Sequence, residues 1–178
     1  MMQNNFSNDE FVNPSKVLMR LPLKANMVAC DLGCGSGGWA IPLAKILNRG
    51  MVYAVDILEE SLSALKGKAE AEQIINISTI LSDIERGVKI EDKELDLILL
   101  TNILYQIQDR ENLIKECRRL LKIRGLLLIV DYKKEATFGP KEGRLIPEEI
   151  IPLLEKLGFR EEQRFDAGKY HWALLLSK

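Results

Sequence analysis

Asp31 closes an apolar run and is followed by three alternating glycines, Gly33, Gly35 and Gly37. Glycine has no Cβ, so this segment can adopt positive φ angles and bring its backbone close to a ligand. An apolar helical pattern begins at Trp39, and the first turn of a helix presents unpaired backbone N–H groups. The pattern is typical of a strand, a tight loop and a helix that bind a small ligand at the carboxyl end of a parallel strand.

The glycine loop is compatible with two classes of ligand. Gly33, Gly35 and Gly38 satisfy the dinucleotide pattern G-x-G-x-x-G, and Asp56 follows at about the 20-residue separation that this pattern requires. Asp31 favours a different ligand, because a carboxylate at the strand end would repel a pyrophosphate but attract a cationic amino group. S-adenosylmethionine carries an α-ammonium and a sulfonium and has no phosphate. A tight turn without a ligand would not need three glycines, which cost conformational entropy.

Residues 31–37, Asp-Leu-Gly-Cys-Gly-Ser-Gly, resemble the first motif of the class I S-adenosylmethionine-dependent methyltransferases. The resemblance is strongest to the small enzymes related to those of ubiquinone and menaquinone biosynthesis. Residues 52–56, Val-Tyr-Ala-Val-Asp, resemble the second strand of this family with its ribose-binding acid. Residues 81–83, 95–102 and 120–131 resemble the parts of the family that follow, up to its fifth strand. The resemblance covers nearly the whole chain and contains nothing specific for a methyl acceptor.

The resemblance implies a set of residues that bind S-adenosylmethionine and its product S-adenosylhomocysteine. Asp56 would accept hydrogen bonds from both ribose hydroxyls, and Ile57 would offer an apolar face to the adenine. Asp83 would accept the adenine amino group, although an aspartate that only stabilises a loop is the alternative. The full set is Asp31, Gly33, Cys34, Gly35, Gly37, Asp56, Ile57, Asp83, Ile84 and Asn102.

Two residues are candidates for contact with the methyl acceptor. Tyr105 follows the fourth strand, where it either touches the substrate or packs on the next helix. His171 is the only histidine and begins the last strand; it is a candidate base, and packing within the sheet is the simpler interpretation. The long polar segment 131–146 follows a central strand, where such loops are often functional, so we interpret it as a substrate gate.

The apolar runs and helix signals predict an α/β fold, a Rossmann-like doubly wound sheet with helices on both faces. Seven strands are expected at residues 27–31, 51–56, 77–81, 95–100, 126–130, 159–166 and 170–176. Helices are expected at residues 13–21, 38–48, 59–73, 109–122 and 147–157. The last two strands form a hairpin, so the final strand is antiparallel in an otherwise parallel sheet. This arrangement favours a methyltransferase over a dehydrogenase.

Composition narrows the class of protein. The 178 residues include 25 Lys and Arg and 26 Asp and Glu, a formal charge of −1, which argues against binding to nucleic acid through bulk charge. The three cysteines, Cys30, Cys34 and Cys117, have no disulfide or metal spacing, so we expect no metal ion. No apolar run approaches the ~20 residues of a membrane span, and the N-terminus lacks a signal peptide's apolar core. These features indicate a cytoplasmic protein.

We therefore expect one methyltransferase domain at residues 13–178, preceded by a flexible arm at residues 1–12. It would move a methyl group to a small molecule by in-line displacement, for which the protein mainly aligns the acceptor and excludes water. A base is needed only if the acceptor must lose a proton. The oligomeric state is not indicated.

Three alternatives remain open at this point. An NAD-dependent oxidoreductase explains the glycines but not Asp31, and no hydride-transfer site is evident. A non-catalytic S-adenosylmethionine-binding domain would differ only in a turnover assay. Arsenite methylation would need converging thiols, whereas Cys34 lies in the glycine loop and Cys30 lies inside a strand.

Overall fold

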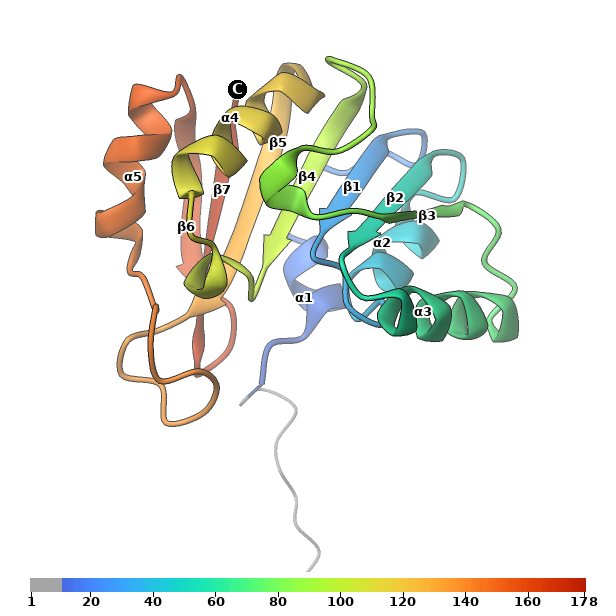
Figure 1. Ribbon diagram of the computed structural model, residues 1–178, viewed down its shortest axis with the longest axis horizontal. Coiled ribbons are helices and arrows are strands. Elements are labelled where there is room, and N and C mark those ends of the chain that lie inside the picture. Colours follow the sequence, from blue (N-terminus) through green and yellow to red (C-terminus); the bar gives the residue numbers. More distant parts are fainter. Residues whose placement is uncertain (1–10) are drawn as a thin grey trace, which may run out of the picture.

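The computed structural model describes residues 11–178, and seven strands form one sheet within them (Figure 1). The predicted N-terminal arm lies almost entirely outside the described residues. The strands are β1 (Val28–Leu32), β2 (Met51–Asp56), β3 (Ile77–Leu81), β4 (Leu95–Thr101), β5 (Leu121–Tyr132), β6 (Arg160–Asp166) and β7 (His171–Ser177). Their order across the sheet is β3-β2-β1-β4-β5-β7-β6. β7 pairs antiparallel with β5 and with β6, and the other neighbouring strands pair parallel, which confirms the predicted fold class.

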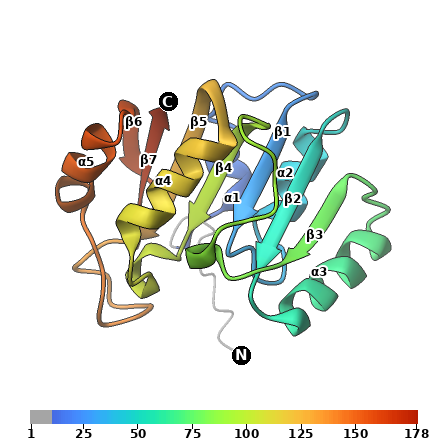
Figure 2. The ribbon, with the colours of Figure 1, turned by 45° about the horizontal axis from the view of Figure 1, so that its top comes forward.

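Helices cover both faces of the sheet (Figure 2). They are α1 (Pro14–Leu18), α2 (Ala40–Ile46), α3 (Glu59–Ala71), α4 (Arg110–Leu120) and α5 (Pro147–Lys156). Two short 3₁₀ turns, η1 (Ile84–Arg86) and η2 (Leu104–Gln106), follow β3 and β4. Within residues 11–178, none of these helices has the length and apolar character that crossing a membrane would require.

The sheet separates two apolar cores. Side chains of α1, α2 and α3 pack on one face, and side chains of α4 and α5 pack on the other. Successive residues of a strand point to opposite faces, so Leu97 and Leu99 of β4 join the first core while Ile98 and Leu100 join the second. This explains why the sequence of a central parallel strand is continuously apolar rather than alternating.

The predicted helix starts are confirmed by their hydrogen bonds. The Asn13 side chain accepts from the Lys16 backbone N–H at 3.1 Å, and the Asp109 side chain accepts from the Asn112 N–H at 2.9 Å. Both satisfy a donor that the first turn of a helix leaves free. The expected strand at residues 126–130 is too short, because β5 already begins at Leu121, which pairs with Leu95. The intervening residues interrupt the register between β4 and β5.

Gly50 links α2 to β2 for a steric reason. A Cβ at this position would lie 1.9 Å from the Met27 carbonyl oxygen, while the neighbouring Met51 N–H donates to that same oxygen at 3.2 Å. The backbone therefore has no room to move away without breaking the start of β2.

We expect Gly50→Ala to lower the free energy of unfolding by about 2–4 kcal/mol, because the clash is with backbone and cannot be relieved by a side-chain rotation. Urea unfolding of the two proteins measures this difference. Gly67→Ala is the matched control, since a Cβ at Gly67 meets no atom within 4 Å and alanine favours the interior of α3. Equal stability of Gly50→Ala and the parent protein would contradict this explanation.

Candidate cofactor site

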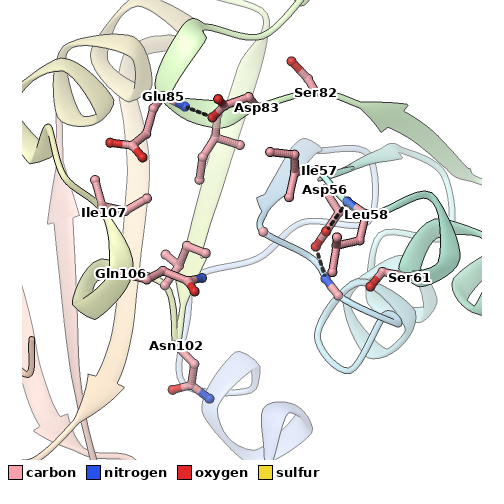
Figure 3. A pocket seen from close by; sticks show the side chains of 14 residues that line it. Asp56, Ile57, Leu58, Ser61, Ser82, Asp83, Glu85, Asn102, Gln106 and Ile107 are labelled. Carbon is pink, nitrogen blue, oxygen red and sulfur yellow. Dashed lines mark hydrogen bonds between the residues drawn. The ribbon is translucent and has the colours of Figure 1, made fainter. Parts of the chain in front are cut away.

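A cavity of about 440 Å³ opens where β1, β2 and β4 end (Figure 3). Its walls are the glycine loop after β1, the start of α3, the η1 segment and the η2 segment. Seven of the ten predicted cofactor residues line it: Gly33, Gly35, Asp56, Ile57, Asp83, Ile84 and Asn102. Three further polar residues line the cavity, Ser61, Glu85 and Gln106; they lie on helical turns without a motif of their own, so no sequence pattern indicates them.

Asp56 holds two walls of the cavity together. One carboxylate oxygen accepts the Gly35 N–H at 2.8 Å, and the other accepts the Leu58 N–H at 2.9 Å (Figure 3). Each carboxylate oxygen can accept two hydrogen bonds, so both keep a lone pair for a ligand. The end of β2 therefore provides a fixed, charged acceptor that faces the cavity.

The backbone of the glycine loop needs its glycines for different reasons. Gly33 and Gly37 have φ angles of +77° and +88°, and a Cβ would lie 2.7 Å from Ile103 Cδ1 or 2.9 Å from Leu65 Cγ, respectively. Gly35, at φ +52°, would meet no protein atom within 4 Å, so its open side faces the cavity. The Lys68 ammonium donates to the carbonyl and the hydroxyl of Ser36 at 3.0 and 2.8 Å and holds the outer side of the loop.

Gly38 does not have the function of the third glycine in a dinucleotide fingerprint. That glycine permits close packing of the helix on the strand, yet a Cβ at Gly38 would meet no atom within 4 Å. Gly37 makes the close contact instead. The geometry therefore does not support the dinucleotide interpretation of this loop.

We expect Gly35→Ala to weaken binding of S-adenosylhomocysteine about tenfold and Gly38→Ala to leave it unchanged. The alanine at 35 would hold a left-handed φ, which costs about 1–2 kcal/mol, and its methyl group would project toward the cavity. Both proteins should fold, since neither methyl group meets another atom within 4 Å. Calorimetric titration measures the affinities, and equal affinities for the two variants would contradict the assignment of the open side of Gly35.

Three predicted residues lie behind the cavity wall: Asp31, Cys34 and Gly37. The Asp31 side chain is fully buried, and neither oxygen has a well-formed hydrogen bond, although the Ala40 backbone N–H approaches it. Burial raises the pKa of Asp31 from 3.8 to about 7; the Ala40 N–H opposes this shift and the Asp56 charge adds to it. Burial likewise raises the pKa of the Cys34 thiol well above its usual range, so it is not a nucleophile at neutral pH.

Asp83 and Asn102 lie on opposite sides of the cavity (Figure 3). Asp83 accepts the Glu85 N–H at 3.0 Å and pairs with Arg86 at 3.2 Å, so it stabilises its loop and lines the cavity at once. Asn102 has a left-handed φ of +54°, and its side-chain oxygen is buried without a hydrogen-bond partner. Asparagine tolerates this left-handed region, so the buried oxygen without a partner is the stronger indication of a ligand here.

The two residues predicted to contact the methyl acceptor, Tyr105 and His171, both pack against the ring of Tyr132. Tyr132 lies with its ring centroid 4.3 Å from that of His171 and 6.1 Å from that of Tyr105. His171 is 2% exposed, and neither imidazole nitrogen has a partner. Burial, together with the charges of Arg144 and Lys133, lowers the pKa of His171 to about 4, so the imidazole is neutral at neutral pH.

The segment interpreted as a gate is folded around Arg144, a residue that no sequence pattern indicates. The guanidinium donates to the backbone carbonyls of Lys133, Lys134, Ala136 and Phe138. The predicted loop at 131–146 begins two residues later than expected, because Asp131 and Tyr132 belong to β5. Asp131 accepts the Leu104 and Tyr132 N–H groups at 3.0 and 2.7 Å and thereby ties η2 to the end of β5.

Comparison with known proteins agrees with this geometry. A family model described as a methyltransferase domain matches residues 23–163. The demethylmenaquinone methyltransferase of Bacillus cereus is 28% identical over 145 residues, which cover 80% of this chain and 61% of that protein. The one of Staphylococcus saprophyticus is 25% identical over 153 residues, covering 85% and 64%. The chain thus spans less than two thirds of the length of these curated relatives.

A solved structure supports the same conclusion. The crystal structure of an S-adenosylmethionine-dependent methyltransferase from Aquifex aeolicus matches with a TM-score of 0.86 and 28% identity, covering 93% of this chain and 89% of that one. The family match, the strand order and the cavity at the end of β1 point to one assignment. The chain therefore belongs to the family of methyltransferase domains.

Proposed function

We propose that the cavity binds S-adenosylmethionine through the seven predicted residues that line it, with Asp31, Cys34 and Gly37 behind its wall, and that the methyl acceptor is a small molecule. The main support for the proposal is that these seven residues, from four separate segments of the chain, line one cavity. The cavity combines the apolar side chains of Ile57 and Ile84 with the carboxylates of Asp56 and Asp83, as a purine nucleoside requires.

Each side chain has a defined part in this proposal. Asp56 accepts hydrogen bonds from the ribose hydroxyls with the lone pairs that its two backbone contacts leave free. Ile57 and Ile84 border the adenine, and Asp83 accepts its amino group. Asp31 is buried behind the loop without a cationic partner, and its charge attracts the α-ammonium.

The reaction needs orientation more than acid–base chemistry. S-adenosylmethionine supplies, when bound, a methyl group on a positively charged sulfur, which is an activated leaving group. The residues around Asn102 hold the acceptor in line and exclude water, and such orientation accounts for large effective molarities. A near-zero net charge of −1 and half-buried aromatic rings beside the cavity favour a small acceptor over a nucleic acid.

Titration calorimetry with S-adenosylmethionine, S-adenosylhomocysteine and NAD tests the proposal. We expect the first two to bind and NAD to show no binding. Binding of NAD alone would overturn the proposal. Because the curated relatives are named for demethylmenaquinone, that compound is the first acceptor to test, with consumption of S-adenosylmethionine as the readout.

A further inference from the structure

A second cavity, of about 580 Å³, lies at the end of the sheet opposite the cofactor cavity. It forms where α4 and α5 end, beside the segment before β4 and the residue after β7. In Figure 1 this region lies near the marked C-terminus, away from the arrowheads at which the cofactor cavity opens. Six of its nine lining residues are basic: Lys93, Lys115, Arg118, Arg119, Lys156 and Lys178. We call it the basic cavity.

Neighbouring carboxylates neutralise three of these six cations. Lys115 and Lys156 share the carboxylate of Glu111, whose oxygens lie 2.9 and 3.4 Å from the two ammonium nitrogens. Arg119 pairs with two carboxylates, one of which is Asp92 at the cavity wall. Exposed ion pairs of this kind are common on protein surfaces and contribute little to stability, so these three cations need no further explanation.

The other three cations, Lys93, Arg118 and Lys178, have no such partner. In the part of the chain that the structure describes, no carboxylate forms an ion pair with any of them. The Arg118 guanidinium lies against Gly158, where a Cβ would come within 3.1 Å of its Nη2 atom. The Lys178 ammonium donates to the Arg118 and Leu121 carbonyls at 2.5 and 2.6 Å. One cation of the three is thus fixed in place.

Three like charges held near one another repel unless an anion joins them. Lys178 is half-buried, and burial, followed by the charges of Arg118 and Lys93, lowers its pKa, while Asp92 opposes the shift. A cation at the end of a helix stabilises the last carbonyls, which explains Lys178. It does not explain why Arg118 and Lys93 lie beside it with their donors unused. An anionic ligand in the cavity explains all three.

We propose that the basic cavity binds a phosphate group with two or more negative charges, with Arg118, Lys93 and Lys178 as its main contacts. A guanidinium offers parallel N–H donors that match adjacent phosphate oxygens, and ammonium groups add point charges beside it. The single charge of a carboxylate would leave most of the positive charge unmatched. The basic cavity is separate from the cofactor cavity, so this proposal does not depend on the proposed function.

Titration calorimetry of tag-free protein with sodium pyrophosphate tests this proposal. Low ionic strength is required, because salt screens exposed charges. We expect pyrophosphate to bind to the parent protein and to bind about tenfold more weakly to Arg118→Gln, which loses one charge-assisted contact. Lys93→Gln should weaken binding in the same direction. Unchanged affinity in both variants would overturn the proposal.

Lys66→Gln is the matched control for these variants. Lys66 is exposed on α3 and does not line the basic cavity, so this substitution changes the net charge by the same amount at a distant position. Its affinity for pyrophosphate should equal that of the parent protein. A loss as large as that in Arg118→Gln would mean that pyrophosphate responds to overall charge, and the proposal would fail. Thermal unfolding checks that each variant is folded.

A second titration shows which cavity pyrophosphate occupies. The protein is first saturated with S-adenosylhomocysteine, and we expect the affinity for pyrophosphate to stay the same. Competition between the two ligands would place pyrophosphate in the cofactor cavity and overturn the proposal. If S-adenosylhomocysteine itself does not bind, the proposed function fails, but the comparison of Arg118→Gln with Lys66→Gln still decides whether the basic cavity binds phosphate.

Vesicles distinguish two sources of the phosphate group, a free phosphorylated molecule and the headgroup of an anionic lipid. Phosphatidic acid presents a phosphate monoester at the vesicle surface, whereas phosphatidylcholine has no net charge. Co-sedimentation with phosphatidic acid vesicles that is lost in Arg118→Gln supports a lipid headgroup. Binding of pyrophosphate without co-sedimentation supports a free ligand. Binding of neither, or equal binding to phosphatidylcholine vesicles, overturns the proposal.

Discussion

Asp56→Ala is expected to weaken binding of S-adenosylhomocysteine about 100-fold. Two hydrogen bonds to a charged group at about 1.5 kcal/mol each correspond to that factor, and the alanine removes the acceptor of both ribose hydroxyls. The Gly35 and Leu58 N–H groups also lose their partner, so the glycine loop loosens. Titration calorimetry measures the affinity, and thermal unfolding without ligand measures the loss of stability.

Two further variants test whether the loss of affinity in Asp56→Ala is due to the site or to the change in net charge. Asp56→Asn keeps one carbonyl oxygen for a backbone N–H but cannot accept from both sides, so its affinity should lie between those of the alanine variant and the parent protein. Asp92→Ala removes a carboxylate of the same charge from an exposed pair with Arg119, outside the cavity. A loss of affinity in Asp92→Ala as large as that in Asp56→Ala would indicate a global charge effect rather than a site.

The sheet could be predicted from the sequence because its strands are buried on both faces. Such strands read as continuous apolar runs, and β4 places Leu97 and Leu99 in one core and Ile98 and Leu100 in the other. Asp56 could be predicted as a site residue for a related reason. A charged residue directly after a buried strand lies at the sheet edge where ligands bind, and its position follows from the strand alone.

Other features depend on contacts that sequence patterns do not contain. The early start of β5 requires Leu121 to meet Leu95 in a register that the following residues break. Gly50 is required by a carbonyl 23 positions earlier in the chain, at Met27. Arg144 gains its importance from four carbonyls brought together by a loop, and an arginine in a polar segment carries no signal of such a contact.

Asp31→Asn is expected to stabilise the ligand-free protein at pH 8. Burial raises the pKa of Asp31 from 3.8 to about 7, so between these values the folded state holds a proton that the unfolded state has released. The contribution of this carboxyl to stability therefore declines as the pH rises from about 4 to 7 and stays low above 7. A neutral asparagine of the same shape avoids this penalty, which amounts to about 4 kcal/mol at most. Urea unfolding at pH 5 and pH 8 measures the difference, which should be larger at pH 8.

The same substitution should weaken binding of S-adenosylhomocysteine about tenfold at pH 8, because the carboxylate no longer attracts the α-ammonium. Affinity of the parent protein should rise with pH through about 7 as Asp31 loses its proton, and this rise should be absent in Asp31→Asn. Methylthioadenosine, which has no amino acid part, is the control ligand, and its affinity should be the same for both proteins. If Asp31→Asn is more stable than the parent protein and binds S-adenosylhomocysteine more weakly, the Asp31 carboxylate contributes to ligand binding and destabilises the fold. If S-adenosylhomocysteine bound both proteins equally at pH 8, the carboxylate would have no part in recognising the ammonium.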